Sequence, residues 1–311
     1  MTTPRHILAI LGCGLAAAAI TVKQTLPSLP PESDYTIGYA PWWIGLAGAA
    51  LGALTTLRLT RVTPATRPAG AAPSRVPVVA AWAAATLLLW SSAGVVLDGF
   101  RSFFALTGIP AGDFAVVDWP GYAARFLSLV ACGAVLSVVV RHSRGTRGGC
   151  AECGTVPADR ASRRVPGLVT IGALWPYPLL KAYWWLGGTV ARPTGFDEGP
   201  PTGELLAVTA ATLLCLTMIR PWWRRTPVWR TTLGAGWAAS AALTSMGALS
   251  VFGTVSQLLG LTDGPVDFDS RTGVVMVSAV YGGWLAAGSG FVVLTWRFQC
   301  ATRPACATCT P

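Results

Sequence analysis

Eight stretches of apolar residues, seven of them long enough to cross a lipid bilayer and the sixth slightly shorter, constrain this chain more than any other feature. A helix needs roughly 17 to 25 mostly apolar residues to span the hydrocarbon core. Within lipid, only a helix or a closed barrel satisfies every backbone amide and carbonyl group. The sequence therefore predicts an all-α integral membrane protein with eight transmembrane helices, at residues 7–27, 39–57, 77–97, 120–140, 167–189, 204–219, 231–252 and 273–296.

Composition supports lipid as the solvent of this 311-residue chain. Hydrophobic residues make up 52% and charged residues only 12%, about half the charged fraction usual in globular domains. The mean hydropathy is +0.53. These values exclude a soluble enzyme, a disordered chain and a secreted disulfide scaffold. The net charge of +10 would suggest nucleic acid in a soluble protein. In a membrane protein such a charge marks cytoplasmic loops, so we expect the lipid bilayer as partner and no nucleic acid.

The arginines indicate how the chain crosses the membrane. Of 21 arginines, 17 fall on one side: in the first residues, in the loops after the second, fourth and sixth spans, and in the C-terminal tail. The other side holds 11 of the 13 acidic residues. Short basic loops stay in the cytoplasm. The sequence thus predicts a multi-pass protein of the cell membrane with both termini cytoplasmic.

The sequence also indicates an internal duplication. Asp113-Phe114 matches Asp267-Phe268, Lys23 in the first span matches Lys181 in the fifth, and a C-x-x-C pair follows both the fourth and the eighth span. The matches keep their order at offsets of 154 to 162 residues. We therefore expect two four-helix repeats, 1–155 and 156–311. Because each repeat has an even number of spans, the repeats are parallel, an arrangement known in transporters and equally open to a duplicated structural protein.

The repeat also bears on the first 25 residues, which have features of a signal peptide. Arg5 precedes an apolar run, and alanines follow at 16–19. Its counterpart in the second repeat lies in the middle of the chain and cannot be a signal. We interpret the segment as a retained span, with a cleaved signal as the alternative.

The eight cysteines include two C-x-x-C pairs on the predicted cytoplasmic side. Two thiolates three residues apart can both reach one tetrahedral ion, and four thiolates with no open position suit structural zinc. We therefore predict one zinc site that joins the halves through Cys150, Cys153, Cys306 and Cys309. A thiol-exchanging dithiol pair and cysteines with no joint role remain as alternatives. The cytoplasmic face that carries these cysteines could also bind a cytosolic protein.

Lys23 and Lys181 are the only lysines of the chain, and both lie within apolar segments. An ionisable side chain at membrane depth predicts a functional site by default. A lysine can also simply extend its ammonium group to the membrane surface. We take Lys23 and Lys181, together with the repeat-equivalent Asp113 and Asp267, as candidate substrate-binding residues. The acidic pair can equally reflect the general sorting of carboxylates to the outer face.

No phosphate-binding loop, nucleophile elbow or zinc-protease motif is present in the sequence. An enzymatic role is therefore disfavoured. The segment Trp175 to Gly188 and the arginine-rich, alanine-rich style of the chain resemble uncharacterised multi-spanning membrane proteins of high-GC actinobacteria. This resemblance implies membrane residence and no particular activity.

The leading hypothesis from the sequence is a transporter or permease-like carrier with a structural four-cysteine zinc site. The alternatives are a membrane scaffold that binds a partner through its zinc knuckles and a membrane thiol oxidoreductase.

Overall fold

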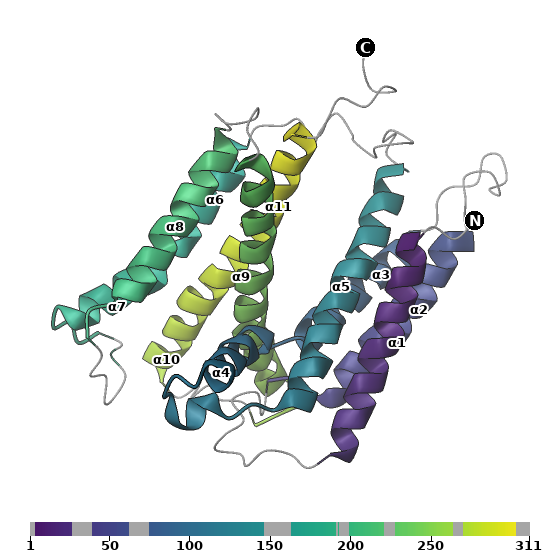
Figure 1. The fold of residues 1–311 in the computed structure, drawn as a ribbon, viewed down its shortest axis with the longest axis horizontal. Helices are drawn as coiled ribbons and strands as arrows, with labels where there is room; N and C mark the ends of the chain where they lie inside the picture. Colours follow the sequence, from purple (N-terminus) through teal and green to yellow (C-terminus); the bar gives the residue numbers. More distant parts are fainter. Residues whose placement is uncertain are drawn as a thin grey trace. The chain divides into compact units, whose positions relative to one another are not determined.

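The computed structural model describes residues 4–26, 39–61, 75–145, 163–190, 192, 199–220, 228–263 and 270–302. Within these ranges all regular secondary structure is helical, and no strand occurs. Figure 1 shows the helices as α1 (Pro4–Thr25), α2 (Trp42–Arg61), α3 (Val76–Ser91), α4 (Val95–Thr107), the 3-10 helix η3 (Gly112–Ala115), α5 (Trp119–Gly145), α6 (Arg164–Leu174), α7 (Pro176–Trp185), α8 (Thr202–Ile219), α9 (Val228–Leu258), α10 (Arg271–Met276), the π-helical η5 (Val277–Tyr281) and α11 (Gly282–Thr302).

Seven helical stretches in the described ranges are long and apolar enough to cross a membrane, where the sequence predicted eight. The difference lies in the predicted span 167–189, which consists of two short helices, α6 and α7, that meet at Trp175. Proline has no amide hydrogen and disrupts a helix that precedes it. Pro176 is the first residue of α7 and accounts for the break. The coarse prediction of a polytopic, all-helical membrane protein agrees with these seven stretches.

The chain divides into two compact units. Unit 1 comprises Met1–Val156 with Val255–Gly264, and unit 2 comprises Pro157–Thr254 with Pro265–Pro311. Each unit is described by itself below. The predicted duplication and the cytoplasmic position of both termini stay predictions.

Unit 1 is built on a ring of four helices, in which α1 packs on α2 and α5, and α3 packs on α2 and α5 (Figure 1). Its core consists mainly of small side chains, including Ala9, Cys13, Ala85 and Ala131. Small residues allow helix backbones to approach closely, which drives helix association in lipid. At Gly48 of α2, an added Cβ would lie 3.0 Å from the backbone nitrogen of Leu88.

A sharp turn between α3 and α4 brings polar residues into the interior of unit 1. Gly94 has a φ of 89°, a left-handed conformation that favours glycine. After this turn, α4 buries Asp98, Arg101 and Ser102 rather than apolar side chains alone. The turn therefore places charged side chains of α4, just after the end of a predicted span, in the interior of unit 1.

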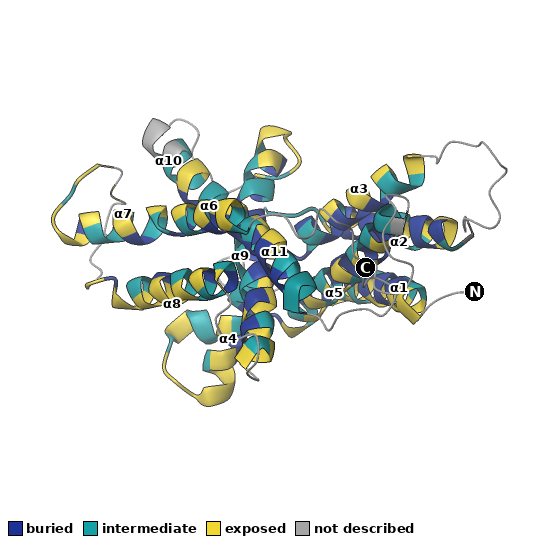
Figure 2. Cartoon of the chain, turned by 90° about the horizontal axis from the view of Figure 1, so that it is seen from above, coloured by how far each residue is buried: buried dark blue, intermediate teal, exposed yellow. Residues whose placement is uncertain are grey.

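Unit 2 contains α6, α8 and α11, which pack on one another, and the greater part of α9. Its core holds larger side chains than that of unit 1, among them Met218, Phe291 and Phe298. Glycines bring α9 and α11 together, since a Cβ at Gly247 would collide with the backbone of Leu285. Figure 2 shows that several helices, α8 among them, also carry exposed residues along their length. Many of these exposed residues are large and apolar, as expected for surfaces that face lipid.

Candidate functional site

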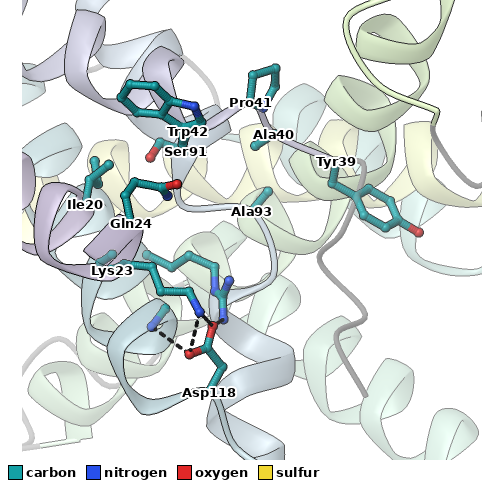
Figure 3. Close-up of a pocket in the computed structure, with 13 residues that line it drawn as sticks. Ile20, Lys23, Gln24, Tyr39, Ala40, Pro41, Trp42, Ser91, Ala93 and Asp118 are labelled. Atoms are coloured by element: carbon teal, nitrogen blue, oxygen red, sulfur yellow. Dashed lines mark hydrogen bonds and ion pairs between the residues drawn. The ribbon is translucent and has the colours of Figure 1, made fainter. Parts of the chain in front are cut away.

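The first predicted site residue, Lys23, is half-buried and forms an ion pair with a buried carboxylate. It lies in the last turn of α1, and its Nζ donates a hydrogen bond to Oδ1 of Asp118 at 3.1 Å and lies 3.0 Å from Oδ2 (Figure 3). The side chain of Lys23 is 17% exposed and that of Asp118 only 4%. Lys23 therefore ends on a carboxylate inside the unit, rather than extending to the surface.

Asp118 is positioned by the start of α5. It directly precedes the helix, and its Oδ1 accepts a hydrogen bond from the backbone amide of Gly121 at 3.2 Å. A carboxylate in this place satisfies a free amide of the first turn and interacts favourably with the positive end of the helix dipole. The start of α5 thus positions the carboxylate of Asp118 independently of its contact with Lys23.

A second pair lies directly behind the first. Arg125 of α5 donates from Nε to Oδ2 of Asp98 at 2.5 Å and from Nη2 to Oδ1 at 3.0 Å. Its Nη2 is also 3.8 Å from Oδ2 of Asp118. Arg125 therefore lies between two carboxylates, and four charged side chains from α1, α4 and α5 form one network. We call Lys23, Asp98, Asp118 and Arg125 the charge cluster.

Arg101 borders the charge cluster on α4. It is 2% exposed, and its Nε donates to the backbone oxygen of Phe114 at 3.3 Å. Its guanidinium carbon lies 5.9 Å from the centre of the Phe114 ring, within range of a cation–π interaction. Arg101 thereby ties η3 to α4 next to the cluster.

A cavity of about 370 Å³ opens beside the charge cluster within unit 1. Three members of the cluster, Lys23, Asp118 and Arg125, line it. Gln24 and Ser91 add neutral hydrogen-bonding groups (Figure 3). The remaining lining is mostly apolar and consists of Ile20, Tyr39, Ala40, Pro41, Trp42, Ala93, Gly121 and Ala124. An apolar pocket with a few convergent polar groups is the usual form of a small-molecule site.

Lys181, the second predicted lysine, has a different environment in unit 2. Its Nζ is 2.8 Å from Oε1 of Glu204 on α8 and 5.5 Å from the centre of the Tyr177 ring. The side chain of Lys181 is 13% exposed, whereas that of Glu204 is 30% exposed. This pair therefore meets solvent or headgroups on its acidic side.

The two predicted aspartates do not extend the candidate site. Asp113 lies in η3, is exposed, and is not among the residues that line the cavity. Asp267 lies outside the described residues. The suggested acidic pair thus stays a prediction.

The four cysteines of the predicted zinc site, Cys150, Cys153, Cys306 and Cys309, also lie outside the described residues. Within the described ranges, no three metal-ligating side chains gather into a group. Of the other cysteines, Cys13, Cys132 and Cys215 are buried and Cys300 is partly buried. The zinc site stays a prediction.

Sequence reasoning missed three members of the charge cluster. In the sequence, Asp118 is one of the 11 acidic residues, and Arg125 one of the arginines, on the side opposite the basic loops. A usable signal was present, because Arg125 falls inside the predicted span 120–140 and Asp98 directly follows the span 77–97. The rule that singled out the lysines, that a charge at membrane depth marks function, applies equally to these residues.

Comparison of the chain with protein-family models, with curated proteins and with solved structures finds no match.

Proposed function

We propose that the protein is a membrane transporter or permease-like carrier whose solute binds in the cavity of unit 1. The observation that carries the proposal is the ion pair of the half-buried Lys23 with the buried Asp118, both of which line a cavity of about 370 Å³. The seven long apolar helices supply the membrane setting.

The energetic cost of the charge cluster supports a functional reading. Removing ions from water costs several kcal/mol for each ion, and mutual attraction repays this only with good geometry. Charged residues within membrane helices are therefore rare, and they mark pathways for substrates or ions. A unit held together by small apolar side chains does not need four such charges for packing alone.

The size of the cavity favours a small solute. Ligand pockets commonly measure about 300 to 1,000 Å³, and this one lies near the lower end. The scaffold and oxidoreductase alternatives depend on cysteines outside the described residues, so no contact in the structure favours them. In the proposed carrier, the four-cysteine zinc site remains a structural element on the cytoplasmic side.

A test of carrier function that does not require the solute is access to the cavity from both sides of the membrane. Ser91 lines the cavity, whereas Ser128, its hydrogen-bonding neighbour at 3.2 Å, is fully buried. The variants Ser91→Cys and Ser128→Cys would be treated with a membrane-impermeant thiol reagent in right-side-out and inside-out vesicles. Peptide mass spectrometry would identify the labelled position among the native cysteines.

A carrier exposes its site alternately to the two sides, so the thiol introduced by Ser91→Cys should be labelled in both vesicle preparations. The matched thiol of Ser128→Cys should stay unlabelled in both. Labelling of Ser91→Cys from one side only would contradict carriage and indicate a receptor or scaffold. Absence of labelling from either side would show that the cavity is closed to solutes.

A further inference from the structure

One oxygen of the charge cluster is held by ion-pair contacts rather than by hydrogen bonds. Oδ2 of Asp118 is buried and accepts no hydrogen bond from any residue that the structure describes. Within the described residues, its contacts are the ion pairs with Nζ of Lys23 at 3.0 Å and with Nη2 of Arg125 at 3.8 Å. Asp118 is therefore already paired with Lys23, and a ligand ammonium group can bind Asp118 only by replacing the Lys23 contact.

The opposite charge is available in the same cavity. Lys23 carries three ammonium hydrogens and lines the cavity beside Gln24 and Ser91. An oxyanion placed here meets an ammonium group and two neutral polar side chains. The cavity therefore offers Asp118 as partner for a cationic group of a ligand and Lys23 as partner for an anionic group. These two side chains are themselves in ion-pair contact.

We infer that the cavity binds a small zwitterion, whose ammonium group pairs with Asp118 and whose oxyanion pairs with Lys23. The inference rests on the proposed function, because it names the ligand class of the same cavity. Binding exchanges the internal Lys23–Asp118 pair for two pairs with the ligand. The total charge of the site does not change in this exchange.

Charge balance selects a zwitterion over singly charged ligands. An anion that takes Lys23 leaves Asp118 dependent on Arg125, which already binds Asp98 through two hydrogen bonds. A cation that takes Asp118 leaves the ammonium group of Lys23 buried without a carboxylate. Leaving one partner of a buried pair uncompensated is strongly unfavourable. Only a ligand that carries both charges keeps each buried ion paired.

Two sources could supply this chemistry: a free amino acid, and the ethanolamine phosphate headgroup of a lipid. Binding would be measured by equilibrium dialysis on the full chain in phosphatidylglycerol nanodiscs, in which no lipid carries an ammonium group. The probes would be glycine, L-alanine and O-phosphoethanolamine. Propionate and ethylamine serve as matched probes, since each keeps the skeleton of L-alanine and lacks one charged group.

We expect at least one zwitterion to bind, with propionate and ethylamine about 10- to 100-fold weaker, the equivalent of one charged hydrogen bond. Preference for an amino acid would indicate a free solute, and preference for O-phosphoethanolamine a lipid headgroup. The inference is overturned if propionate or ethylamine binds as tightly as the zwitterions, or if no zwitterion binds at about 10 mM, near the weak end of specific affinities.

Variants locate the binding within the cavity. Lys23→Met should abolish zwitterion binding, while Lys181→Met in unit 2 should leave it unchanged. Because Lys23→Met also disturbs an ion pair, Gln24→Trp provides a second block. Gln24 is exposed on α1 and lines the cavity, so a larger side chain there should take up ligand space without disturbing the core. Binding that survives Gln24→Trp would contradict the assignment.

The two proposals fail in different ways. If no zwitterion binds while the thiol of Ser91→Cys is labelled from both sides, the carrier stands and the ligand class is wrong. If a zwitterion binds and the thiol is labelled from one side only, the ligand class stands and the carrier is wrong.

Discussion

The two lysines are equivalent in the predicted repeats, yet their surroundings in the two units differ. In unit 1, Lys23 pairs with a carboxylate that is 4% exposed, which in turn neighbours Arg125 and a cavity. In unit 2, Lys181 pairs with Glu204, whose side chain is 30% exposed. The lysine alone therefore does not make a site. The burial of the partner carboxylate, Asp118 or Glu204, is what distinguishes the two pairs.

The sequence accounts for this difference. The offset of 154 residues that relates Asp113 to Asp267 can be applied to the partners of Lys23. At this offset, Asp98, Arg101, Asp118 and Arg125 correspond to Phe252, Val255, Thr272 and Ala279, none of which carries a charge. If the halves arose by duplication, the charge cluster belongs to one half only. We therefore expect one solute site per chain, in unit 1.

The largest expected effect concerns the metal, because the C-x-x-C pairs are a feature that both halves share. We expect about one zinc per chain in purified protein, since one tetrahedral site takes four thiolates. Cys150→Ser and Cys306→Ser should each remove it, measured by elemental analysis beside the unchanged chain. Metal-free protein, prepared reduced and without chelators, would rule out the four-cysteine site and turn attention to thiol exchange.

Loss of Arg125 should be the most damaging change within the charge cluster. Arg125→Met leaves Asp98 buried without its bidentate partner, and the expected cost is about 3–5 kcal/mol in the free energy of unfolding. Unfolding in mixed detergent micelles would measure it. The double variant Arg125→Met with Asp98→Leu should recover much of the loss, because no stranded carboxylate remains. A single variant as stable as the unchanged chain would show that the cluster is not buried as described.

Unit 2 should depend on close helix packing more than on charge. Gly247→Ala places a methyl group against the backbone of Leu285, and we expect a loss of about 1–3 kcal/mol from overpacking. Gly234→Ala on the same helix is the control, because nothing lies within 4 Å of its Cβ position. Thermal unfolding in nanodiscs compares the two variants. Equal stability of both would contradict the close approach of α9 and α11.

The smallest expected effect is the loss of the Lys181–Glu204 pair, whose carboxylate is the more accessible of the two. Lys181→Met should change the free energy of unfolding by less than about 1 kcal/mol, since a pair whose carboxylate keeps contact with solvent contributes little. Lys23→Met should cost more, because Asp118 stays buried. The same unfolding measurement compares both variants. A larger loss from Lys181→Met than from Lys23→Met would reverse the comparison between the units.

Hydropathy predicts most of the fold because crossing a membrane constrains length and composition directly. The exception was the span 167–189, where Pro176 divides the helix, and the prolines that cause the break are visible in the sequence. The site was harder to predict. Lys23 was found because a lone lysine in an apolar run is conspicuous, whereas its partners come from α4 and α5. Only the turn at Gly94 and the packing of α1 on α5 bring these three helices together.

The number of binding sites per chain tests the central claim most directly. Equilibrium dialysis with the tightest-binding of the zwitterionic probes, radiolabelled, would count sites in the unchanged chain, in Lys23→Met and in Lys181→Met. The account predicts one site per chain, which is absent in Lys23→Met and retained in Lys181→Met. Two sites per chain, or one site that survives Lys23→Met and disappears in Lys181→Met, would contradict it.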